Sequence, residues 1–401
     1  MSGWLEELDR LAVSRAKAGL TRQLRPRPPG RSVVDLAGND YLGLADHPRV
    51  IAAATEALTR YGLGATGSRL VRGSTMEHAA LETALASWLG APAALVFSSG
   101  YLANLAAVRS LAALTDLIVS DAYNHASLID GCRLAAKKTV IAPHNSPSTV
   151  AEILDAHLAA GVASSPVPSD VPGADGAGIG GRPTAVVVTE SVFSVDGDLA
   201  PLAELHEVTS ARGALLLVDD AHALGLLGPA GAGGVAAAGL AGRPDVVVTA
   251  TLSKALGGAG GVIAGPVQFV DHLVDTGRTF IYDTALPPAV ASGVQEALRI
   301  AQSADDRRAL LASRAALAVG RLRAAGFQVA TPAAGVLSVL APGPEAALAW
   351  AADCRDRDVA VGCFRPPSTP DGTSRLRLTL NAGISDHDFA RALDVIVECA
   401  P

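Results

Sequence analysis

Seven short apolar segments in the middle of the chain constrain the fold more than any other feature. They cover residues 93–99, 116–121, 138–143, 184–190, 214–220, 245–251 and 260–265. Each is continuously apolar rather than alternating, which is typical of strands buried on both faces. Most of the gaps between them are long enough for a helix, so we expect a mostly parallel sheet with helices on both faces. The last two are joined only by a short glycine-rich link and should pair antiparallel.

The rest of the chain predicts further helices and a second, smaller domain. Helices are expected over 1–25, ending at the "RPRPPG" breaker, over 48–62 and over 76–90. Beyond about 290, helical segments and the apolar runs "GVLSVLAPG" and "RLRLTL" indicate a small C-terminal α/β domain. We therefore expect an N-terminal helix and segment over 1–47, a large domain over 48–289 and a small domain over 290–401. Residues 161–183, rich in Gly, Pro, Ser and Asp, should form an exposed and dispensable insertion.

Composition excludes several classes of protein. The net charge is −7, aromatic residues make up 4% of the chain and no basic block is present, so we do not expect nucleic-acid binding. The amphipathic start has no signal-peptide core, and no apolar run approaches the length of a membrane span. The four cysteines show no metal-ligand spacing. We expect a cytoplasmic protein with reduced thiols and without a metal site.

Residues that could take part in catalysis or binding follow the carboxyl ends of the predicted strands. In open α/β sheets, ligands bind beyond these ends. They supply Ser99, Gly100 and Tyr101 after the first strand, His125 after the second, Glu190, Ser194 and Asp196 after the fourth, Asp219 and His222 after the fifth, and Thr251, Ser253 and Lys254 after the sixth. Taken singly, each has an ordinary explanation as a helix cap, a core histidine or a surface lysine. Together, at neighbouring strand ends, they indicate one ligand-binding or catalytic site.

Lys254 is the most informative member of this set. An amine at the end of a buried strand, with no carboxylate nearby in sequence, is costly unless the site uses it, for instance in a Schiff base. Pyridoxal phosphate requires such a lysine, an acid that keeps its ring nitrogen protonated, a phosphate cup and a flat partner over the ring. Asp219 supplies the acid. The helix start at Ser99–Tyr101 suits the phosphate.

The chain resembles the α-oxoamine synthases, which are pyridoxal-phosphate enzymes of fold type I. The resemblance implies an α/β fold with a large domain, built on a seven-stranded mostly parallel sheet, and a small C-terminal α/β domain. It rests on "NDYLGL" at 39–44, "GATGSRLVRGS" at 64–74, "FSSGY" at 97–101, "NHASLIDG" at 124–131, "VFSVDGDLAPL" at 192–202, "VDDAHALG" at 218–225, "TLSKALGG" at 251–258 and "RPPSTPDGTSRLRLTLNA" at 365–382.

The resemblance also implies roles for single residues. Lys254, His125 and Asp219 would be catalytic: the Schiff-base lysine, the ring that stacks on the pyridine and the partner of its nitrogen. Further cofactor contacts would come from His222, at the phenolic oxygen, and from Gly100, Tyr101, Ser194 and Thr251. The substrate contacts would be Arg377 at the amino-acid carboxylate, Asn39, Ser368 in place of the family's usual threonine, and one N-terminal arginine, for which Arg22 and Arg25 are both candidates.

The implied reaction is a decarboxylative condensation of an amino acid with an acyl thioester. The "RPPSTP" stretch before "RLRLT" favours the branch that joins L-alanine to a pimeloyl group, carried by coenzyme A or by acyl carrier protein, in biotin biosynthesis. The alternatives are a relative that joins glycine to acetyl-CoA, an aminotransferase of the same fold, and a non-catalytic nucleotide-binding protein.

Relatives of this fold type build their active sites between two subunits, so a homodimer with shared sites is expected. The loops "GATGSRLVRGS" and "GRTFIYDTALPP", at 64–74 and 277–288, are the segments that would reach the partner, with Thr284 or its neighbours at the partner's cofactor phosphate.

Overall fold

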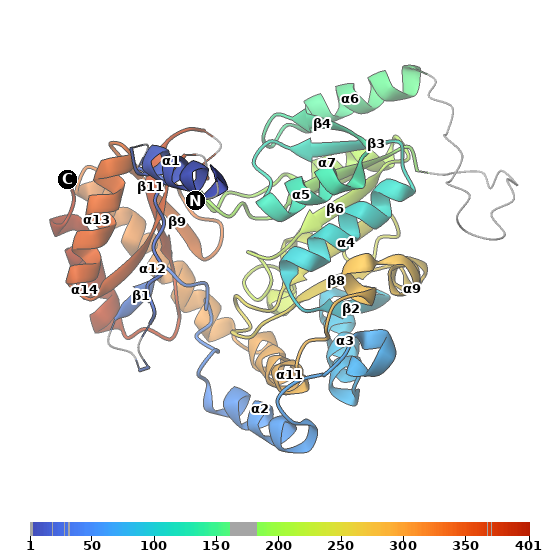
Figure 1. Cartoon of the computed structure of the whole chain (residues 1–401), viewed down its shortest axis with the longest axis horizontal. Helices are drawn as coiled ribbons and strands as arrows, with labels where there is room; N and C mark the ends of the chain where they lie inside the picture. Colours follow the sequence, from blue (N-terminus) through green and yellow to red (C-terminus); the bar gives the residue numbers. More distant parts are fainter. Residues whose placement is uncertain are drawn as a thin grey trace, which may run out of the picture.

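The computed structural model divides into a large and a small body (Figure 1). It describes residues 3–17, 19–27, 29–30, 33–160, 183–366, 368–369 and 371–401. The insertion expected at 161–183 lies outside the described residues, except for Pro183 at its end.

The large body contains the predicted seven-stranded sheet, and every predicted strand is confirmed. The strands are β2 (Ala93–Phe97), β3 (Leu117–Asp121), β4 (Lys138–Ala142), β5 (Ala185–Glu190), β6 (Leu215–Asp219), β7 (Val246–Thr251) and β8 (Gly261–Gly265). Their order in the sheet is β2-β8-β7-β6-β5-β3-β4. β8 runs antiparallel to β7 and β2, and the other pairs are parallel. The antiparallel pairing of β7 with β8 is the one that the short link between them predicts.

Helices cover both faces of this sheet, because alternate strand residues point into two separate cores. Ile118, Val186 and Leu217 belong to the core under α4 (Gly100–Ala113), α5 (Ala126–Ala135) and α9 (Val267–Thr276). Their neighbours Val119, Val187 and Leu216 face the other core. Around these lie α2 (Pro48–Tyr61), η1 (Arg69–Gly73), α3 (Met76–Leu89), α6 (Pro147–Ala159), α7 (Leu202–Ser210), η2 (Pro229–Gly231), α8 (Gly234–Ala237), α10 (Arg278–Ile281) and α11 (Pro288–Gln302).

The predicted helices over 48–62 and 76–90 are confirmed as α2 and α3. Pro48 occupies the first turn of α2, where its missing N–H costs nothing. Gly90 ends α3 with a φ of +64°, a left-handed conformation that glycine adopts without strain. The proline that marks the start of α2 and the glycine that marks the end of α3 can both be identified from the sequence.

The small body is a four-stranded sheet packed on helices. Its strands are β1 (Val34–Leu36), β9 (Val336–Ala341), β10 (Val359–Phe364) and β11 (Ser374–Thr379), in the order β1-β10-β11-β9. Its helices are α12 (Asp305–Ala324), α13 (Pro344–Asp356) and α14 (Asp386–Glu398). β1 pairs parallel with β10, so the N-terminal segment contributes a strand to this sheet, which the sequence analysis did not predict.

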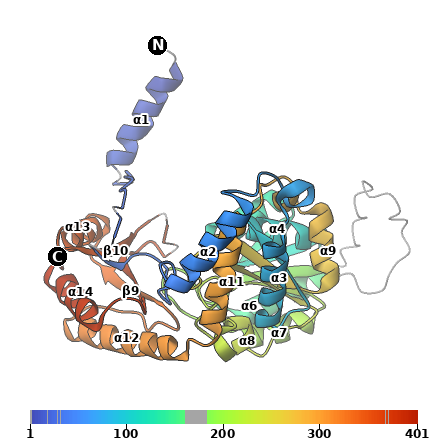
Figure 2. The same ribbon diagram turned by 90° about the horizontal axis from the view of Figure 1, so that it is seen from below.

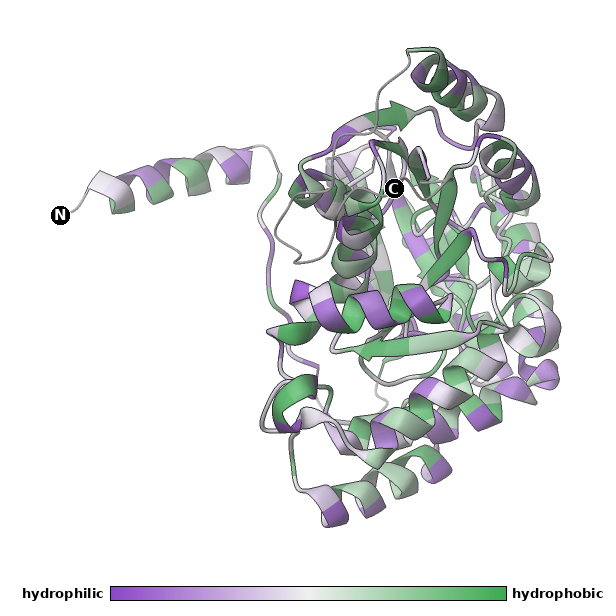
Figure 3. Cartoon of the chain, turned by 90° about the vertical axis from the view of Figure 1, so that its right-hand side faces the viewer, coloured by the Kyte–Doolittle hydropathy of each residue, from purple (hydrophilic) through white to green (hydrophobic). Residues whose placement is uncertain are grey.

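The N-terminal helix α1 (Gly3–Lys17) is shorter than the predicted 1–25. The chain turns at Gly19, whose φ is +64°, and the N–H groups of Gly19 and Leu20 donate to carbonyls of the last helical turn. Figures 2 and 3 show α1 projecting away from both bodies. Its apolar side chains, Trp4, Leu5, Leu8 and Leu11, are therefore 43–64% exposed. Among the described residues, no helix combines the length and the apolar character needed to cross a bilayer.

Candidate active site

The predicted site residues of the large sheet meet at the carboxyl ends of β5, β6 and β7. Lys254 follows the end of β7 by three residues, and its Nζ lies 2.8 Å from His222 Nε2. The other ring nitrogen of His222 lies 2.6 Å from the hydroxyl of Tyr41, which is fully buried. Tyr41 belongs to the motif "NDYLGL", but the sequence analysis assigned it no role.

The surroundings of Lys254 favour a neutral amine. Burial lowers the pKa of Lys254 to about 8, although the carboxylates of Asp219 and Glu190 oppose the shift. Burial, with Lys254 and Arg377 nearby, also lowers the pKa of His222 well below its usual value. A neutral imidazole and a readily deprotonated amine are the protonation states that a nucleophilic lysine requires.

Asp219 is held in the site by hydrogen bonds from two neighbours, one of which is itself held by Thr249. It is buried, and one carboxylate oxygen accepts a 2.7 Å hydrogen bond from Asn104 Nδ2, while the other accepts from the N–H of Ala221 at 3.0 Å. Thr249 Oγ1 donates to Asn104 Oδ1 at 2.5 Å, which fixes the orientation of the amide. Asn104, on the inner face of α4, carries no motif that would have identified it from sequence.

His125 stands at the start of α5, with Nδ1 2.7 Å from the hydroxyl of Ser127. Burial lowers its pKa, opposed by Asp219 and reinforced by Lys254 and Arg377. The ring therefore lies within the electrostatic reach of the other predicted catalytic residues and is held neutral.

Glu190, at the end of β5, is a buried carboxyl that the sequence analysis noticed without assigning a role. It is 2% exposed, and its Oε1 has no hydrogen-bond partner among the described residues. Burial and the neighbouring Asp219 raise its pKa well above the usual value. The protonated form is thereby favoured.

Arg377 reaches this cluster from β11 in the small body. It is 7% exposed, donates to Asn39 Oδ1 at 2.8 Å and lies 5.3 Å from the centre of the Phe364 ring. Its Nε has no hydrogen-bond partner among the described residues. The predicted substrate residues Asn39 and Arg377 are thus brought together from opposite ends of the chain. The remaining N–H groups of Arg377 could donate to a carboxylate.

The start of α4 and the end of β7 form a small cradle of donors. Ser99 caps α4, accepting from the N–H of Leu102 at 3.2 Å, and the hydroxyls of Thr251 and Ser253 lie 2.7 Å apart. A Cβ on Gly100 would lie 3.1 Å from Thr251 Cβ, so a larger residue here would crowd the end of β7. Free N–H groups at a helix start together with hydroxyls suit a phosphate, so this donor set fits pyridoxal phosphate. Tyr101 points elsewhere: it is 42% exposed and its hydroxyl donates to Asp130.

The loop after β5 belongs to the large body and contacts the small body through its side chains. It carries Ser194, half-buried, and Asp196, which forms an ion pair with the buried guanidinium of Arg375 on β11. Ser338 Oγ on β9 also donates to Asp196, at 2.6 Å. Arg375 lies two residues from Arg377, so this ion pair fixes the loop of Ser194 relative to Arg377.

A second polar clamp supports the same loop. His144 lies 2.9 Å from a carboxylate oxygen of Asp121 and 2.9 Å from one of Asp198, and it stacks on Tyr123 at 4.2 Å between ring centres. Burial lowers its pKa, but the two hydrogen-bonded carboxylates outweigh burial and raise it to about 9.

We expect this clamp to make the protein's thermal stability depend on pH. Because the folded-state pKa of His144 is raised from 6.5 to about 9, its stabilisation is complete below pH 6.5 and is lost as pH rises through about 9. Replacing His144 with glutamine should lower the melting temperature by roughly 3 °C at pH 6, and by much less at pH 9.5. Differential scanning calorimetry of both proteins across this range measures the difference, and a difference independent of pH would contradict the assignment.

The remaining predicted substrate residues lie elsewhere. Arg22, Arg25 and Ser368 are all exposed and line a separate groove under the N-terminal segment, together with Arg365. None of them forms a recorded hydrogen bond with the Lys254 cluster within the described residues.

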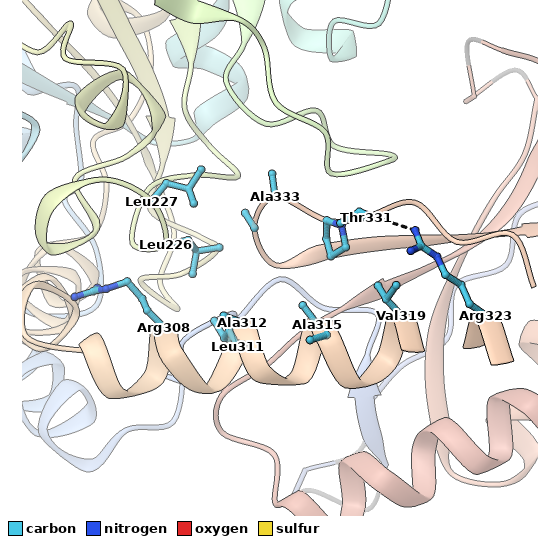
Figure 4. Close-up of a pocket in the computed structure, with 13 residues that line it drawn as sticks. Leu226, Leu227, Arg308, Leu311, Ala312, Ala315, Val319, Arg323, Thr331 and Ala333 are labelled. Atoms are coloured by element: carbon cyan, nitrogen blue, oxygen red, sulfur yellow. Dashed lines mark hydrogen bonds between the residues drawn. The ribbon is translucent and has the colours of Figure 1, made fainter. Parts of the chain in front are cut away.

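A further, mostly apolar groove of about 360 Å³ lies along α12 (Figure 4). Leu226, Leu227 and Leu311 form part of its lining, and Arg308 and Arg323 stand towards its two ends. Both arginines already donate to carbonyl oxygens of the chain, and no predicted site residue lines this groove.

Comparison with known proteins agrees with this geometry. Residues 31–396 match the family model described as aminotransferase class I and II. The chain is 48% identical to the 8-amino-7-oxononanoate synthases of Mycolicibacterium gilvum and of Mycolicibacterium smegmatis, with 98% of this chain and 96% of each relative aligned.

Solved structures show the same architecture. The serine palmitoyltransferase of Sphingomonas wittichii superposes with a TM-score of 0.86 at 30% identity, covering 98% of this chain and 97% of that one. The 8-amino-7-oxononanoate synthase of Francisella tularensis superposes with a TM-score of 0.74 at 26% identity, covering 92% of this chain and 98% of that one. A further neighbour, with a TM-score of 0.86, is a serine palmitoyltransferase bearing a pyridoxal-phosphate internal aldimine.

Fold and site together define a pyridoxal-phosphate-dependent transferase of fold type I. At close to half identity over almost its whole length, the chain belongs to the 8-amino-7-oxononanoate synthase family. The fold class, the family and the cofactor expected from the sequence are thereby confirmed.

Proposed function

We propose that this protein condenses L-alanine with a pimeloyl thioester, releasing carbon dioxide and the carrier thiol and giving 8-amino-7-oxononanoate for biotin biosynthesis. The observation that carries the proposal is the buried cluster that brings together Lys254, whose pKa is lowered to about 8, the buried Asp219, and Arg377, which donates to Asn39. The names of the nearly half-identical relatives support the choice of alanine and the pimeloyl group.

The residues of the large sheet would hold the cofactor. Pyridoxal phosphate, when bound, supplies an electron sink for charge developing at the amino acid's Cα. Lys254 would bond it covalently, Asp219 would keep the proton on its ring nitrogen and His125 would stack on the ring. Four other residues complete the proposed set: His222 and Ser194 at the phenolic oxygen, and Gly100 and Thr251 at the phosphate. Tyr101 contributes through its backbone at the helix start, because its hydroxyl is engaged with Asp130.

The substrate would approach from the side of the small body. Arg377 and Asn39 bind the carboxylate of alanine, and the donors of Arg377 support this role. Lys254 would remove the proton from Cα, for which its lowered pKa is suited. His125 assists the loss of carbon dioxide. Arg22 or Arg25, with Ser368, contacts the acyl donor.

We also propose the division into segment 1–47, large domain 48–289 and small domain 290–401, and a cytoplasmic location. The pairing of β1 with β10 ties the first segment to the small domain. All four cysteines have free thiols in the structure, as a reducing compartment maintains.

The proposed homodimer shares its active sites. Exposed apolar side chains on and around η1, namely Leu63, Leu70, Val71 and Met76, support a covered interface there. The neighbouring loop 277–288 is joined to this region by the hydrogen bond from Ala285 N–H to the carbonyl of Gly67, and its Thr284 is exposed. We propose that Thr284 reaches the partner's cofactor phosphate.

Mixing two inactive variants tests this sharing. Thr284→Glu places a negative charge against the partner's phosphate, and Lys254→Ala removes the amine. If sites are shared, each mixed dimer contains one site with both defects and one with neither, so roughly a quarter of wild-type activity should return after random exchange. Native mass spectrometry confirms the exchange. Mixed dimers without activity would mean that each subunit supplies its own complete site.

The proposed reaction is tested by identifying the product. Holoenzyme is incubated with L-alanine, glycine or L-serine and with pimeloyl-CoA, pimeloyl-acyl carrier protein, acetyl-CoA or palmitoyl-CoA, and the products are analysed by mass spectrometry. The proposal expects 8-amino-7-oxononanoate and carbon dioxide without any added keto acid. A requirement for a keto acid would identify an aminotransferase, and preferred use of glycine and acetyl-CoA would identify the alternative relative.

A further inference from the structure

A continuous series of hydrogen bonds joins Asp219 to His125, two residues that the proposed function places against the same cofactor ring. Asn104 Nδ2, on α4, lies 2.7 Å from a carboxylate oxygen of Asp219 and 2.8 Å from Ser127 Oγ on α5. Ser127 Oγ in turn lies 2.7 Å from His125 Nδ1. Asn104, Ser127 and Asp219 are all buried, so water does not replace a partner that is lost from this network.

The direction of each hydrogen bond in this network follows from the carboxylate at its end. A carboxylate only accepts, so Asn104 turns its amide nitrogen towards Asp219. The amide oxygen of Asn104 then accepts from Thr249 Oγ1 at 2.5 Å, which fixes the same orientation from the other side. The second amide N–H is donated to Ser127 Oγ. The hydroxyl proton of Ser127 is therefore left for the ring of His125.

The backbone of Ser127 gives a second, independent indication of which ring nitrogen of His125 carries the proton. The N–H of Ser127 donates to His125 Nδ1 at 3.2 Å, as part of the cap of α5. A ring nitrogen that accepts a hydrogen bond carries no proton, so the neutral ring carries its proton on Nε2. Within the described part of the chain, Nε2 forms no recorded hydrogen bond. Its N–H is therefore available to a ligand.

The contact between Asn104 and Ser127 depends on the close packing of α4 against α5. Gly131 lies about one turn along α5 from Ser127, and Val108 lies about one turn along α4 from Asn104. A Cβ on Gly131 would lie 2.9 Å from Val108 Cβ, which is closer than two such atoms approach. A side chain at position 131 would therefore displace Val108 or separate the helices, and glycine lets the two polar side chains meet.

We propose that Asn104 and Ser127 are positioning residues that hold His125 in the tautomer protonated on Nε2 and connect it to Asp219. This inference rests on the proposed function and gives the two residues different parts in it. Nε2–H of His125 donates a hydrogen bond to the carbonyl oxygen of the acyl group while carbon dioxide is lost, and Ser127 serves this later stage alone. Asn104 serves both stages, because it also holds the carboxylate that is needed earlier, when the Cα proton of alanine is removed.

Nitrogen NMR of the histidine-labelled holoenzyme tests the tautomer independently of turnover. The chain has nine histidines, so the ring signals of His125 are identified by their loss in His125→Asn. In wild type we expect an unprotonated, hydrogen-bonded Nδ1 and a protonated Nε2. Ser127→Ala should move the Nδ1 signal towards that of a weaker acceptor, whereas Ser110→Ala, at a buried serine of α4, should not. A proton on Nδ1 in wild type would overturn the proposal, and this result needs no change at Ser127 or Asn104.

Two rates measured on the same holoenzymes then separate the parts of Ser127 and Asn104. One is exchange of the alanine Cα proton in deuterium oxide without an acyl donor, and the other is kcat for the condensation product with pimeloyl-CoA. Ser127→Ala should lower kcat about tenfold with the exchange rate and the KM for L-alanine unchanged, and Asn104→Ala should lower both rates about tenfold. Ser110→Ala should change neither rate.

The outcome for Ser127→Ala decides whether the hydroxyl acts through His125. Equal losses of exchange and of product formation would show a merely structural role and would overturn the proposal, as would a kcat equal to that of wild type. Absence of condensation with every thioester in wild type would refute the proposed function instead. The ring-nitrogen signals and the exchange rates would still test the network in that case, so the two failures are distinguishable.

Discussion

Replacing Lys254 with alanine is expected to reduce product formation by about a thousandfold or more, while the protein still folds. Lys254 is the amine that lies 2.8 Å from His222, and burial lowers its pKa to about 8. No other residue of the described site offers an amine. Steady-state rates measure the loss, and circular dichroism with the melting temperature checks the fold.

Covalent trapping identifies the lysine directly. Borohydride reduction of the wild-type holoenzyme, followed by peptide mass mapping, should find the cofactor on Lys254. The chain has only three other lysines, Lys17, Lys137 and Lys138, so the assignment is unambiguous. Lys138→Ala, at an exposed position of β4, is the matched control and should retain full activity. A label on any lysine other than Lys254 would refute the assignment.

Replacing Asp219 with asparagine is expected to slow removal of the Cα proton of alanine by about two to three orders of magnitude. Asparagine preserves the shape of the side chain but not the charge that holds a proton on the ring nitrogen. The neighbours Asn104 and Ala221 remain, so the position of the side chain should change little. The exchange of the alanine Cα proton in deuterium oxide, followed by nuclear magnetic resonance, measures this step.

The adjacent Asp220 provides the control. Its side chain points to the other side, where it accepts from the N–H of Gly234 at 2.9 Å and pairs with Ser191. Asp220→Asn should lower the melting temperature and leave the exchange rate near that of wild type. An unchanged exchange rate in Asp219→Asn would show that Asp219 is not the partner of the ring nitrogen.

The sheet was predictable because its signals are local. Continuous β-branched runs such as 184–190 and 245–251 allow few alternatives to buried strands, and the short link before 260–265 excludes a crossover helix. The same logic located Lys254, Asp219 and His222, since the ends of neighbouring parallel strands meet at one edge.

The unpredicted features depend on long-range contacts. β1 is only three residues long and pairs with a strand more than 300 positions away, so nothing in its own sequence marks it. Asn104 has the spacing of any buried helical residue, and only the fold brings it to Asp219. The end of α1 was misplaced because the proline-rich breaker is a stronger sequence signal than Gly19.

The pairing of β1 with β10 has a consequence for the order of assembly during synthesis. All seven strands of the large sheet have left the ribosome once residue 265 is exposed, but β1 must wait for residues 359–361 before it can pair. Asn39 and Tyr41 follow β1 directly, and Arg377 arrives later still. A nascent chain can therefore bring Lys254 and Asp219 together long before any carboxylate-binding partner is in place, so its first ligand during biosynthesis would be the cofactor and not the amino acid.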